Sequence, residues 1–219
     1  AEWVTRTVSL DVLNNLICAD VDSLSPFAVF ERTQAASVVT VPPASQPYSG
    51  VVLSAGLVTA NGDPVPGRTL QFAVNGTAVG SATTGSAGTA TLALAPGQVP
   101  AGLYSSGVEV SFDGDAEFSA STGVGDLSVA RAPLVIRASD ASRVLGAPNP
   151  PLTGTVQGLI GGDTVGVGYT TPATPASAAG TYPIVPVVTD SAGRLANYDT
   201  QVINGTLTVT YDVCVLFDQ

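Results

Sequence analysis

Short stretches in which apolar and polar residues alternate recur along the whole chain. The clearest is NGTLTVT at 204–210, where Leu207 and Val209 alternate with threonines after an Asn-Gly pair. Such alternation indicates a strand with one buried face, and Asn204-Gly205 indicates a tight turn because both residue types accept a positive φ. A similar phrase, GDLSVA, lies at 125–130, about eighty residues earlier. We expect these two phrases to be the closing strands of two successive β-sandwiches.

Residues 34–131 show about seven strand-like stretches, with turn residues every 8–12 positions. The stretches 69–74 and 77–82 are joined by Asn75-Gly76, which predicts a hairpin. Residues 33–47 hold three prolines and are expected to be a connector, with a first strand at 37–41. This spacing is typical of an Ig-type sandwich. The phrases at 58–92 and 104–118 resemble bacterial Ig-like repeats, and the resemblance implies the same fold.

Residues 132–210 contain a series of short motifs, namely NPPLT (149–153), GLIGGD (158–163), GTYPI (180–184), NY (197–198) and NGTLTVT (204–210). In this order they resemble the "mostly bacterial Ig" (MBG) domain, which implies a second Ig-like sandwich over nearly all of this segment. The stretch 143–152 is expected to be a rigid crossing because its prolines fix φ. At Val144-Leu145-Gly146 the family usually has an aromatic before the glycine. We expect an aliphatic core contact in its place.

The two ends of the chain have incomplete strand patterns. Residues 1–33 show only three candidate strands, which cannot close a core alone. Their phrase ICADVDSLSPFA at 17–28 resembles the C-terminal end of a domain found in multi-module bacterial surface proteins. We therefore expect four segments: C-terminal strands of a partial β domain at 1–33, a bacterial Ig-like domain at 34–131, an MBG-type domain at 132–210, and an orphan strand at 211–219.

Composition supports an all-β fold. The chain has 24 glycines and 16 prolines in 219 residues, which leaves no room for long helices. The predicted fold class is all-β, with tandem Ig-like β-sandwiches and unfinished strands at both ends. No run of 18 apolar residues occurs, so membrane insertion is not expected. Because the sequence has no methionine, we expect a processed product or a piece of a longer protein.

Charge excludes several classes of function. The net charge is -10, from 17 acidic residues against seven arginines, which argues against nucleic acid and anionic membranes as partners. Lysine is absent, which rules out Lys-Asn isopeptide cross-links. Histidine is also absent, so the commonest general base and metal ligand is missing. We expect no enzymatic activity and no cofactor.

The acidic residues suggest a weak calcium hypothesis. Asp113 and Asp115, with Glu117 close by, are the candidates, although Ca²⁺ needs six to eight oxygens and the loop lacks EF-hand spacing. A turn with solvated carboxylates is the favoured alternative. Asp11, Asp20 and Asp22 form an even weaker candidate, for which solvated strand edges are favoured.

Two further surface features have ordinary explanations. Asn75-Gly76-Thr77 and Asn204-Gly205-Thr206 fit the N-glycosylation sequon, but both fit hairpin turns better. Four scattered aromatic residues could stack on a sugar, but core or boundary packing is the favoured interpretation; they are Trp3, Tyr48, Tyr104 and Tyr169.

The two cysteines leave an alternative open. Cys18 and Cys214 lie near opposite ends and have no metal-knuckle or redox-pair spacing. They are either free thiols (or partners of cysteines elsewhere) or a Cys18–Cys214 disulfide, within one chain or between chains.

The apolar tail suggests a route to assembly. A tail of one subunit could complete the 1–33 fragment of the next by strand addition, giving a head-to-tail filament. The assembly candidates are Val213, Cys214, Val215, Leu216 and Phe217 on one side and Cys18, Phe27 and Phe30 on the other. The alternatives are a spacer fragment of a large surface adhesin, flanked by modules of the same chain, and a non-catalytic carbohydrate-binding module. All three imply an extracellular protein at the cell surface.

Overall fold

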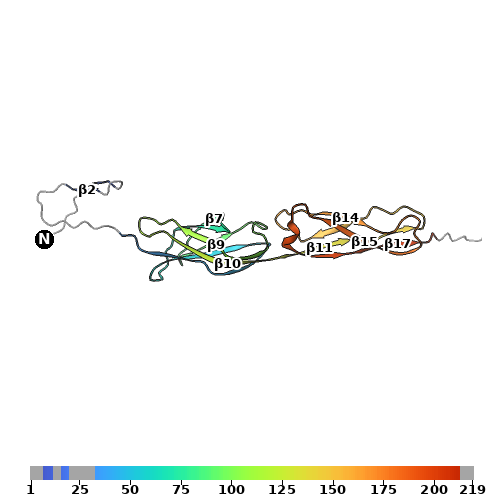
Figure 1. Ribbon diagram of the computed structural model, residues 1–219, viewed down its shortest axis with the longest axis horizontal. Helices are drawn as coiled ribbons and strands as arrows, with labels where there is room; N and C mark the ends of the chain where they lie inside the picture. The colour runs from blue at the N-terminus through green and yellow to red at the C-terminus, as the bar shows by residue number, and fades with distance from the viewer. Residues whose placement is uncertain (1–6, 12–15, 20–32, 213–219) are drawn as a thin grey trace, which may run out of the picture. The chain divides into compact units, whose positions relative to one another are not determined.

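The computed structural model describes residues 7–11, 16–19 and 33–212 of the chain (Figure 1). The chain divides into two compact units, Ala1–Thr33 and Gln34–Gln219. In the first unit the described backbone is an antiparallel pair, β1 (Thr7–Asp11) and β2 (Leu16–Ala19), in which Ser9 lies opposite Cys18. The second unit contains two β-sandwiches, and the predicted all-β class is confirmed.

The first sandwich consists of eight strands in two sheets. One sheet has the order β3-β5-β8 and the other β4-β10-β9-β6-β7. The strands are β3 (Ser37–Thr40), β4 (Ala44–Pro47), β5 (Val52–Thr59), β6 (Thr69–Val74), β7 (Thr77–Thr83), β8 (Thr89–Ala93), β9 (Gly102–Phe112) and β10 (Ser121–Ala130). All neighbours pair antiparallel except β4, which runs parallel to β10.

The second sandwich has sheets of order β13-β11-β16 and β12-β17-β15-β14. The strands are β11 (Ala132–Ala138), β12 (Ala141–Val144), β13 (Gly154–Gln157), β14 (Gly166–Thr170), β15 (Gly180–Thr189), β16 (Tyr198–Ile203) and β17 (Gly205–Thr210). One 3₁₀ turn, η1 (Arg194–Asn197), precedes β16. In the described part of the chain, no helix has the length and apolar character needed to cross a bilayer.

Alternation along each strand builds the two cores. In β6, Leu70, Phe72 and Val74 are buried, while Thr69 and Gln71 face outward. Each buried side chain of this size contributes about 1.5–3 kcal/mol through the hydrophobic effect. The larger core cluster fills the first sandwich and continues into the second through Ala132, Leu134, Ile136 and Tyr198. A separate small cluster in the second sandwich comprises Ala138, Ala173, Ile184 and Leu207.

The two Asn-Gly pairs have different structures. Asn75 and Gly76 both have positive φ, of 47° and 74°, and join β6 to β7, as predicted. Asn204-Gly205 was predicted to be the same kind of turn, and this was wrong: neither residue has a positive φ among the described residues. β16 and β17 belong to different sheets, so the chain crosses between sheets at this point. A Cβ at Gly205 would lie 2.6 Å from the Ser139 carbonyl oxygen, so close packing requires the glycine.

The expected aliphatic core contact near Gly146 was also wrong. Val144 is 43% exposed and Leu145 is 44% exposed, so neither side chain reaches the core. Leu145 lies just beyond the edge strand β12, where the chain turns at the end of the sandwich.

Candidate functional site

The two sandwiches are joined by a single residue and meet at a built interface, which we call the junction. β10 ends at Ala130 and β11 begins at Ala132, so only Arg131 separates them. From the first sandwich the junction takes Tyr48 and the loop 94–101. From the second it takes the turn at 158–163 and the segment 190–198. The two segments from the second sandwich contain the GLIGGD and NY motifs.

Backbone hydrogen bonds fix the position of Tyr48. It follows β4, whose parallel pairing with β10 brings it beside the end of the last strand. Its N–H donates to the Ala130 carbonyl at 2.9 Å, and its own carbonyl accepts from the Gly97 N–H at 3.2 Å. The side chain is only 1% exposed. Tyr48 therefore projects from the end of the first sandwich and is covered by the second.

The Asp163 carboxylate is the centre of the junction. Its Oδ2 accepts hydrogen bonds from the hydroxyls of Tyr48, at 2.8 Å, and Tyr198, at 2.9 Å. Its Oδ1 lies 3.4 Å from Nε of Arg194, and the Asp163 side chain is only 8% exposed. Burying a carboxylate is costly unless it is paired and hydrogen-bonded. These three donors, one from the first sandwich and two from the second, supply that pairing.

Asn197 adds a second polar bridge between the sandwiches. Its Oδ1 accepts from the Ala101 N–H at 2.9 Å, and its Nδ2 donates to the Tyr48 hydroxyl at 3.3 Å. The Tyr198 hydroxyl also accepts from the Ile160 N–H at 2.9 Å. Within the described residues, no buried side-chain nitrogen or oxygen lacks a partner.

Packing completes the interface. The rings of Tyr48 and Tyr198 meet edge to face, with centroids 5.6 Å apart and planes at 83°. Gly161 has a φ of 64°, and a Cβ there would clash with the carbonyl oxygen of Pro96. The backbones of the two sandwiches approach this closely only because residue 161 has no side chain.

The junction keeps both tyrosines neutral. Burial, followed by the hydrogen bond to Asp163 and its negative charge, raises the pKa of Tyr48 to about 12. Burial also raises the pKa of Tyr198, and the Asp163 carboxylate adds to the effect. Both hydroxyls therefore remain hydrogen-bond donors at any ordinary pH. The carboxylate is buried and engaged by three donors, so the arrangement fastens two modules together and presents no exposed nucleophile or base.

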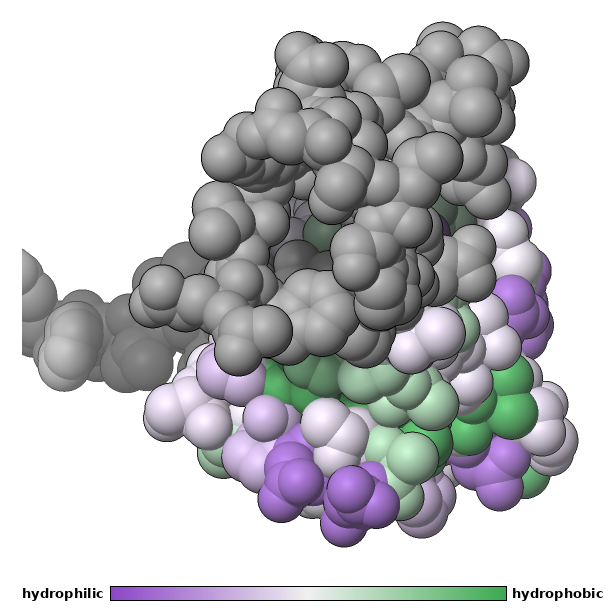
Figure 2. Space-filling view, turned by 90° about the vertical axis from the view of Figure 1, so that its left-hand side faces the viewer, coloured by the Kyte–Doolittle hydropathy of each residue, from purple (hydrophilic) through white to green (hydrophobic). Residues whose placement is uncertain are grey.

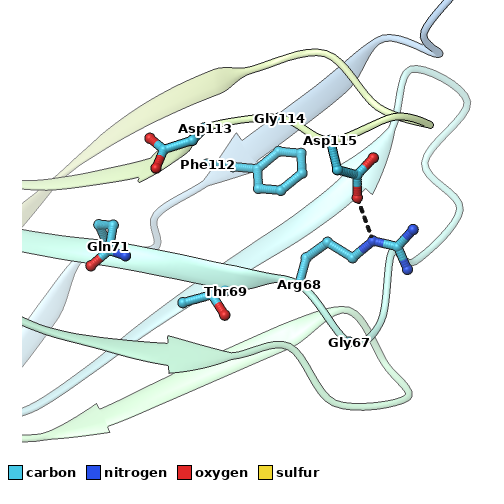
Figure 3. Close-up of a pocket in the computed structure, with 8 residues that line it drawn as sticks. All are labelled: Gly67, Arg68, Thr69, Gln71, Phe112, Asp113, Gly114 and Asp115. Atoms are coloured by element: carbon cyan, nitrogen blue, oxygen red, sulfur yellow. Dashed lines mark hydrogen bonds and ion pairs between the residues drawn. The ribbon is translucent and has the colours of Figure 1, made fainter.

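The predicted calcium candidates lie at the other end of the first sandwich. They line a surface depression of about 310 Å³ with Arg68, Gln71 and Phe112 (Figure 3). Figure 3 shows Asp115 turned toward Arg68, whereas Asp113 points away, so the two carboxylates do not converge. Arg68 Nε donates to Asp115 Oδ2 at 2.9 Å.

Asp115 also closes its own turn. Its Oδ1 accepts from the N–H groups of Glu117 and Phe118, both at 2.8 Å. These bonds, and then Arg68, lower the pKa of Asp115. Arg68 pairs with Glu117 as well, and its guanidinium lies 5.2 Å from the centroid of the Phe118 ring. The carboxylates therefore stabilise a turn through backbone hydrogen bonds and ion pairs with Arg68.

The structure separates the four aromatic residues of the sugar hypothesis. Tyr48 lies in the junction, Tyr104 donates to the Pro100 carbonyl oxygen at 2.8 Å, and Tyr169 packs against the small core cluster of the second sandwich. Trp3 lies outside the described residues. Of the two sequons, that at Asn75 is in the β6–β7 turn and that at Asn204 is in the sheet crossing.

Most of the assembly candidates lie outside the part of the chain that the structure describes. Val213, Cys214, Val215, Leu216, Phe217, Phe27 and Phe30 lie outside the described residues, as do Asp20 and Asp22. Cys18 is described only through its backbone, in β2. The Cys18–Cys214 disulfide therefore stays a prediction.

The described surface is chemically mixed. Figure 2 shows hydrophobic and hydrophilic residues side by side on the face it presents. The most exposed large apolar side chain is Leu103, at 84%, followed by Tyr211, at 69%, and Val124, at 58%. Within the described residues, no group of three or more His, Cys, Asp or Glu side chains could hold a metal ion.

The comparisons with known proteins agree with the sequence-based family assignment of the second sandwich. Residues 134–208 match the family model described as "MBG domain (YGX type)". The matched segment includes the junction residues Asp163, Arg194, Asn197 and Tyr198. No curated protein matches the chain.

Three solved structures to which the chain is similar are the following. Extracellular domains 3–5 of Drosophila OTK are 13% identical, with a TM-score of 0.31, over 78% of this chain and 62% of that one. The Yersinia pseudotuberculosis adhesin InvE is 17% identical, with a TM-score of 0.32, over 81% and 59%. A Ca²⁺-stabilised adhesin with which an Antarctic bacterium binds ice is 16% identical, with a TM-score of 0.29, over 83% and 50%. The chain thus spans between half and about three fifths of these neighbours' own length.

Sequence reasoning did not find the junction. The GLIGGD and NY motifs contain Asp163, Asn197 and Tyr198 but predict no contact for them, and for Tyr48 the sequence predicts only packing in a core or at a boundary. A usable signal was present, because both motifs belong to the second sandwich yet neither carries the apolar alternation of a core strand.

Proposed function

We propose that this chain is an extracellular structural segment of a bacterial cell-surface protein, in which the two sandwiches act as one stiff spacer. The observation that carries the proposal is the buried junction, where Asp163 of the second sandwich binds Tyr48 of the first. Neighbouring domains of one chain usually move relative to each other unless their interface is large and well packed. Here the connector is one residue, and bending would strip donors from a buried carboxylate.

The free-energy cost of breaking the hydrogen bonds of the junction favours a stiff arrangement. Leaving a buried polar group without its partner costs about 1–3 kcal/mol, and more if the group is charged. A hinge motion at Arg131 would expose or unpair the Tyr48 hydroxyl, Asp163 and Asn197 together. Thermal energy does not supply that cost often, so one relative arrangement of the two sandwiches dominates.

An extracellular location is supported by sequence and family. Residues 134–208 match the MBG domain family, and the phrase at 17–28 resembles part of multi-module bacterial surface proteins. The strongly acidic, lysine-free composition offers neither nucleic acid nor an anionic membrane a basic binding face. Antibodies to the chain should label intact cells of the organism that makes it. Labelling only after the cells are permeabilised would contradict this location.

Stiffness can be tested by backbone ¹⁵N relaxation of the full chain in solution. A stiff spacer requires the two sandwiches to tumble with one anisotropic diffusion tensor. Asp163→Ala should give each sandwich its own, shorter correlation time. Different correlation times in the unmodified chain would refute the spacer proposal.

A more specific proposal is that copies of the chain assemble by strand addition. The described part of the first unit is a two-stranded sheet, and an isolated pair of strands is only marginally stable in water. A third strand, such as 213–217 from another copy, would complete it and place Cys214 near Cys18. Electron microscopy and non-reducing gels test this: filaments with disulfide-linked ladders are expected. Monomers at every concentration would exclude strand addition and leave the spacer proposal intact.

A further inference from the structure

The second sandwich repeats, at its far end, the local structure that positions Tyr48. In the first sandwich β4 runs parallel to β10, and in the second β12 runs parallel to β17. The Tyr48 N–H donates to the carbonyl of the last residue of β10 at 2.9 Å. In the same way, the Leu145 N–H donates to Thr210, the last residue of β17, at 2.8 Å. Leu145 is therefore the counterpart of Tyr48.

The turns that follow are also equivalent. The Gly50 N–H donates to Pro47 at 3.1 Å, and the Ala147 N–H donates to Val144 at 3.2 Å. In both sandwiches the side chain in question begins a turn directly after the edge strand. The correspondence thus extends over the strand, its partner and the turn.

The two counterparts differ in exposure. Tyr48 is 1% exposed because the second sandwich covers it, whereas Leu145 is 44% exposed. Val144, beside it, is 43% exposed, and Tyr211, which corresponds to the connector residue Arg131, is 69% exposed. This end of the second sandwich therefore has the same backbone arrangement as the Tyr48 side of the junction, but no described residue of another sandwich covers it.

The loops at this end are held in place from inside. Arg143, which is 7% exposed, donates from Nε to Asn149 Oδ1 at 2.8 Å and from a terminal nitrogen to the Thr174 carbonyl at 2.5 Å. Asn149 Nδ2 donates to the Ala173 carbonyl at 2.6 Å. The buried guanidinium therefore ties the loop that carries Leu145 to the loop at 171–179. Such a surface can bind a partner without first paying the entropy of ordering its loops.

The chemistry of this end indicates what it can bind. The loops 145–153 and 171–179 contain no charged residue, and leucine cannot donate a hydrogen bond. An Asp163-type carboxylate placed against Leu145 would lose the phenol donor that Tyr48 supplies at the junction. A partner that buries an apolar group there would meet no such penalty.

We propose that the end of the second sandwich around Leu145 is a docking face for a following Ig-type module. The socket of a module is the surface that corresponds to Asp163 and Tyr198 at the junction, and in the module that binds Leu145 this socket is apolar. The residue directly after the edge strand selects the module that fits: tyrosine selects a socket built on an aspartate, and leucine selects an apolar one. This inference rests on the proposed stiff spacer, because it extends the same end-to-end contact to the next junction.

The test adds a third sandwich to the chain. A second copy of residues 132–219 replaces residues 212–219, so that Tyr211 becomes the one-residue connector. Four variants are made. Residue 145 of the first copy is leucine or tyrosine, and the socket of the added copy is either the original one or an apolar one that carries Asp163→Leu and Tyr198→Phe. Spin labels on cysteines at the exposed Thr181 of both copies, with Cys18 and Cys214 changed to serine, report the distance distribution across the new junction.

The matched pairs should each give one narrow distance peak: Leu145→Tyr with the original socket, and native Leu145 with the apolar socket. The two mismatched pairs should lose the single peak and give a broad distribution. The inference is overturned if Leu145 and Leu145→Tyr give the same distance distribution against the original socket. This comparison does not change the sequence of the socket, so it does not depend on whether the altered copy folds.

A second label pair separates the two proposals. Labels at the exposed Thr91 and at Thr181 of the first copy span the original junction. A narrow peak there, with an insensitive new junction, overturns only the inference. A broad distribution at the original junction refutes the spacer proposal itself.

Discussion

The two sandwiches are stabilised in different ways. The first buries large side chains throughout, among them Phe72 and Phe112, in one extensive cluster. The second has an independent cluster of only four buried residues, and much of its remaining buried surface, such as Leu134 and Ile136, continues into the core of the first. The junction therefore supports the second sandwich as well as connecting it to the first. It predicts unequal consequences when each part is damaged.

Damage to the first core should have the largest effect. Phe72 is 1% exposed, and Phe72→Ala is expected to cost about 3–5 kcal/mol through lost burial and the cavity left behind. Because the second sandwich depends on the first, amide hydrogen exchange should accelerate in both. The matched change Ile184→Ala, at a residue with 0% exposure, should accelerate exchange in the second sandwich alone. If each substitution accelerated hydrogen exchange only in its own sandwich, and to the same degree, the second sandwich would not depend on the first.

Alkaline pH should weaken the junction before it weakens the first core. The pKa of Tyr48 is raised to about 12, so its stabilising contribution is complete below the unfolded value near 10 and is lost as the pH rises toward 12. The loss at high pH should be about 2–3 kcal/mol, and Tyr198 should add to it with the same sign. Urea unfolding across this pH range measures the effect. Tyr48→Phe should remove the part of the loss that is due to Tyr48 and leave the part that is due to Tyr198, and an unchanged profile would contradict the assignment.

Removal of the central carboxylate should separate the two sandwiches at neutral pH. Asp163→Ala leaves the Tyr48 and Tyr198 hydroxyls without their acceptor, at an expected cost of about 1–3 kcal/mol to the second sandwich. Segment-resolved hydrogen exchange should show faster opening there and little change in the first core. Asp199→Ala, at an exposed position in β16, is the matched control and should have little effect on either sandwich.

The smallest contrast concerns the two Asn-Gly pairs. Asn75→Ala places alanine at a φ of 47°, which costs about 1–2 kcal/mol. Asn204→Ala, at an exposed residue without a positive φ, should change the unfolding free energy by less than about 0.5 kcal/mol. Thermal unfolding distinguishes them. A comparable loss at Asn204 would mean that this residue also forms a required turn.

Sequence alone predicted the fold class and the MBG segment because both depend on local patterns. Alternation in a strand such as β6 determines which side chains are buried, and Asn75-Gly76 determines a turn of two residues. These predictions were confirmed. The domain boundaries stay predictions, as do the strand-addition partners at 213–217.

The missed features depend on contacts between segments far apart in the sequence. β4 was assigned to a connector and β12 to the start of a proline-locked crossing. Each has only four residues, and its parallel pairing with a last strand more than sixty positions away gives no local signal. Tyr48 and Leu145 follow these two strands, so their roles were missed with them. Asn204 was misassigned because the same dipeptide serves a turn in one sandwich and a tight sheet crossing in the other.

The most direct test of the junction is the distance distribution between its two sides. Spin labels at Thr91 in β8 and Thr181 in β15, in the full chain with both cysteines changed to serine, span it without touching it. A single narrow distribution is expected, and Asp163→Ala should broaden it while each sandwich stays folded. A broad distribution in the unmodified chain, unchanged by Asp163→Ala, would contradict the conclusion that this buried carboxylate holds the two sandwiches in one arrangement.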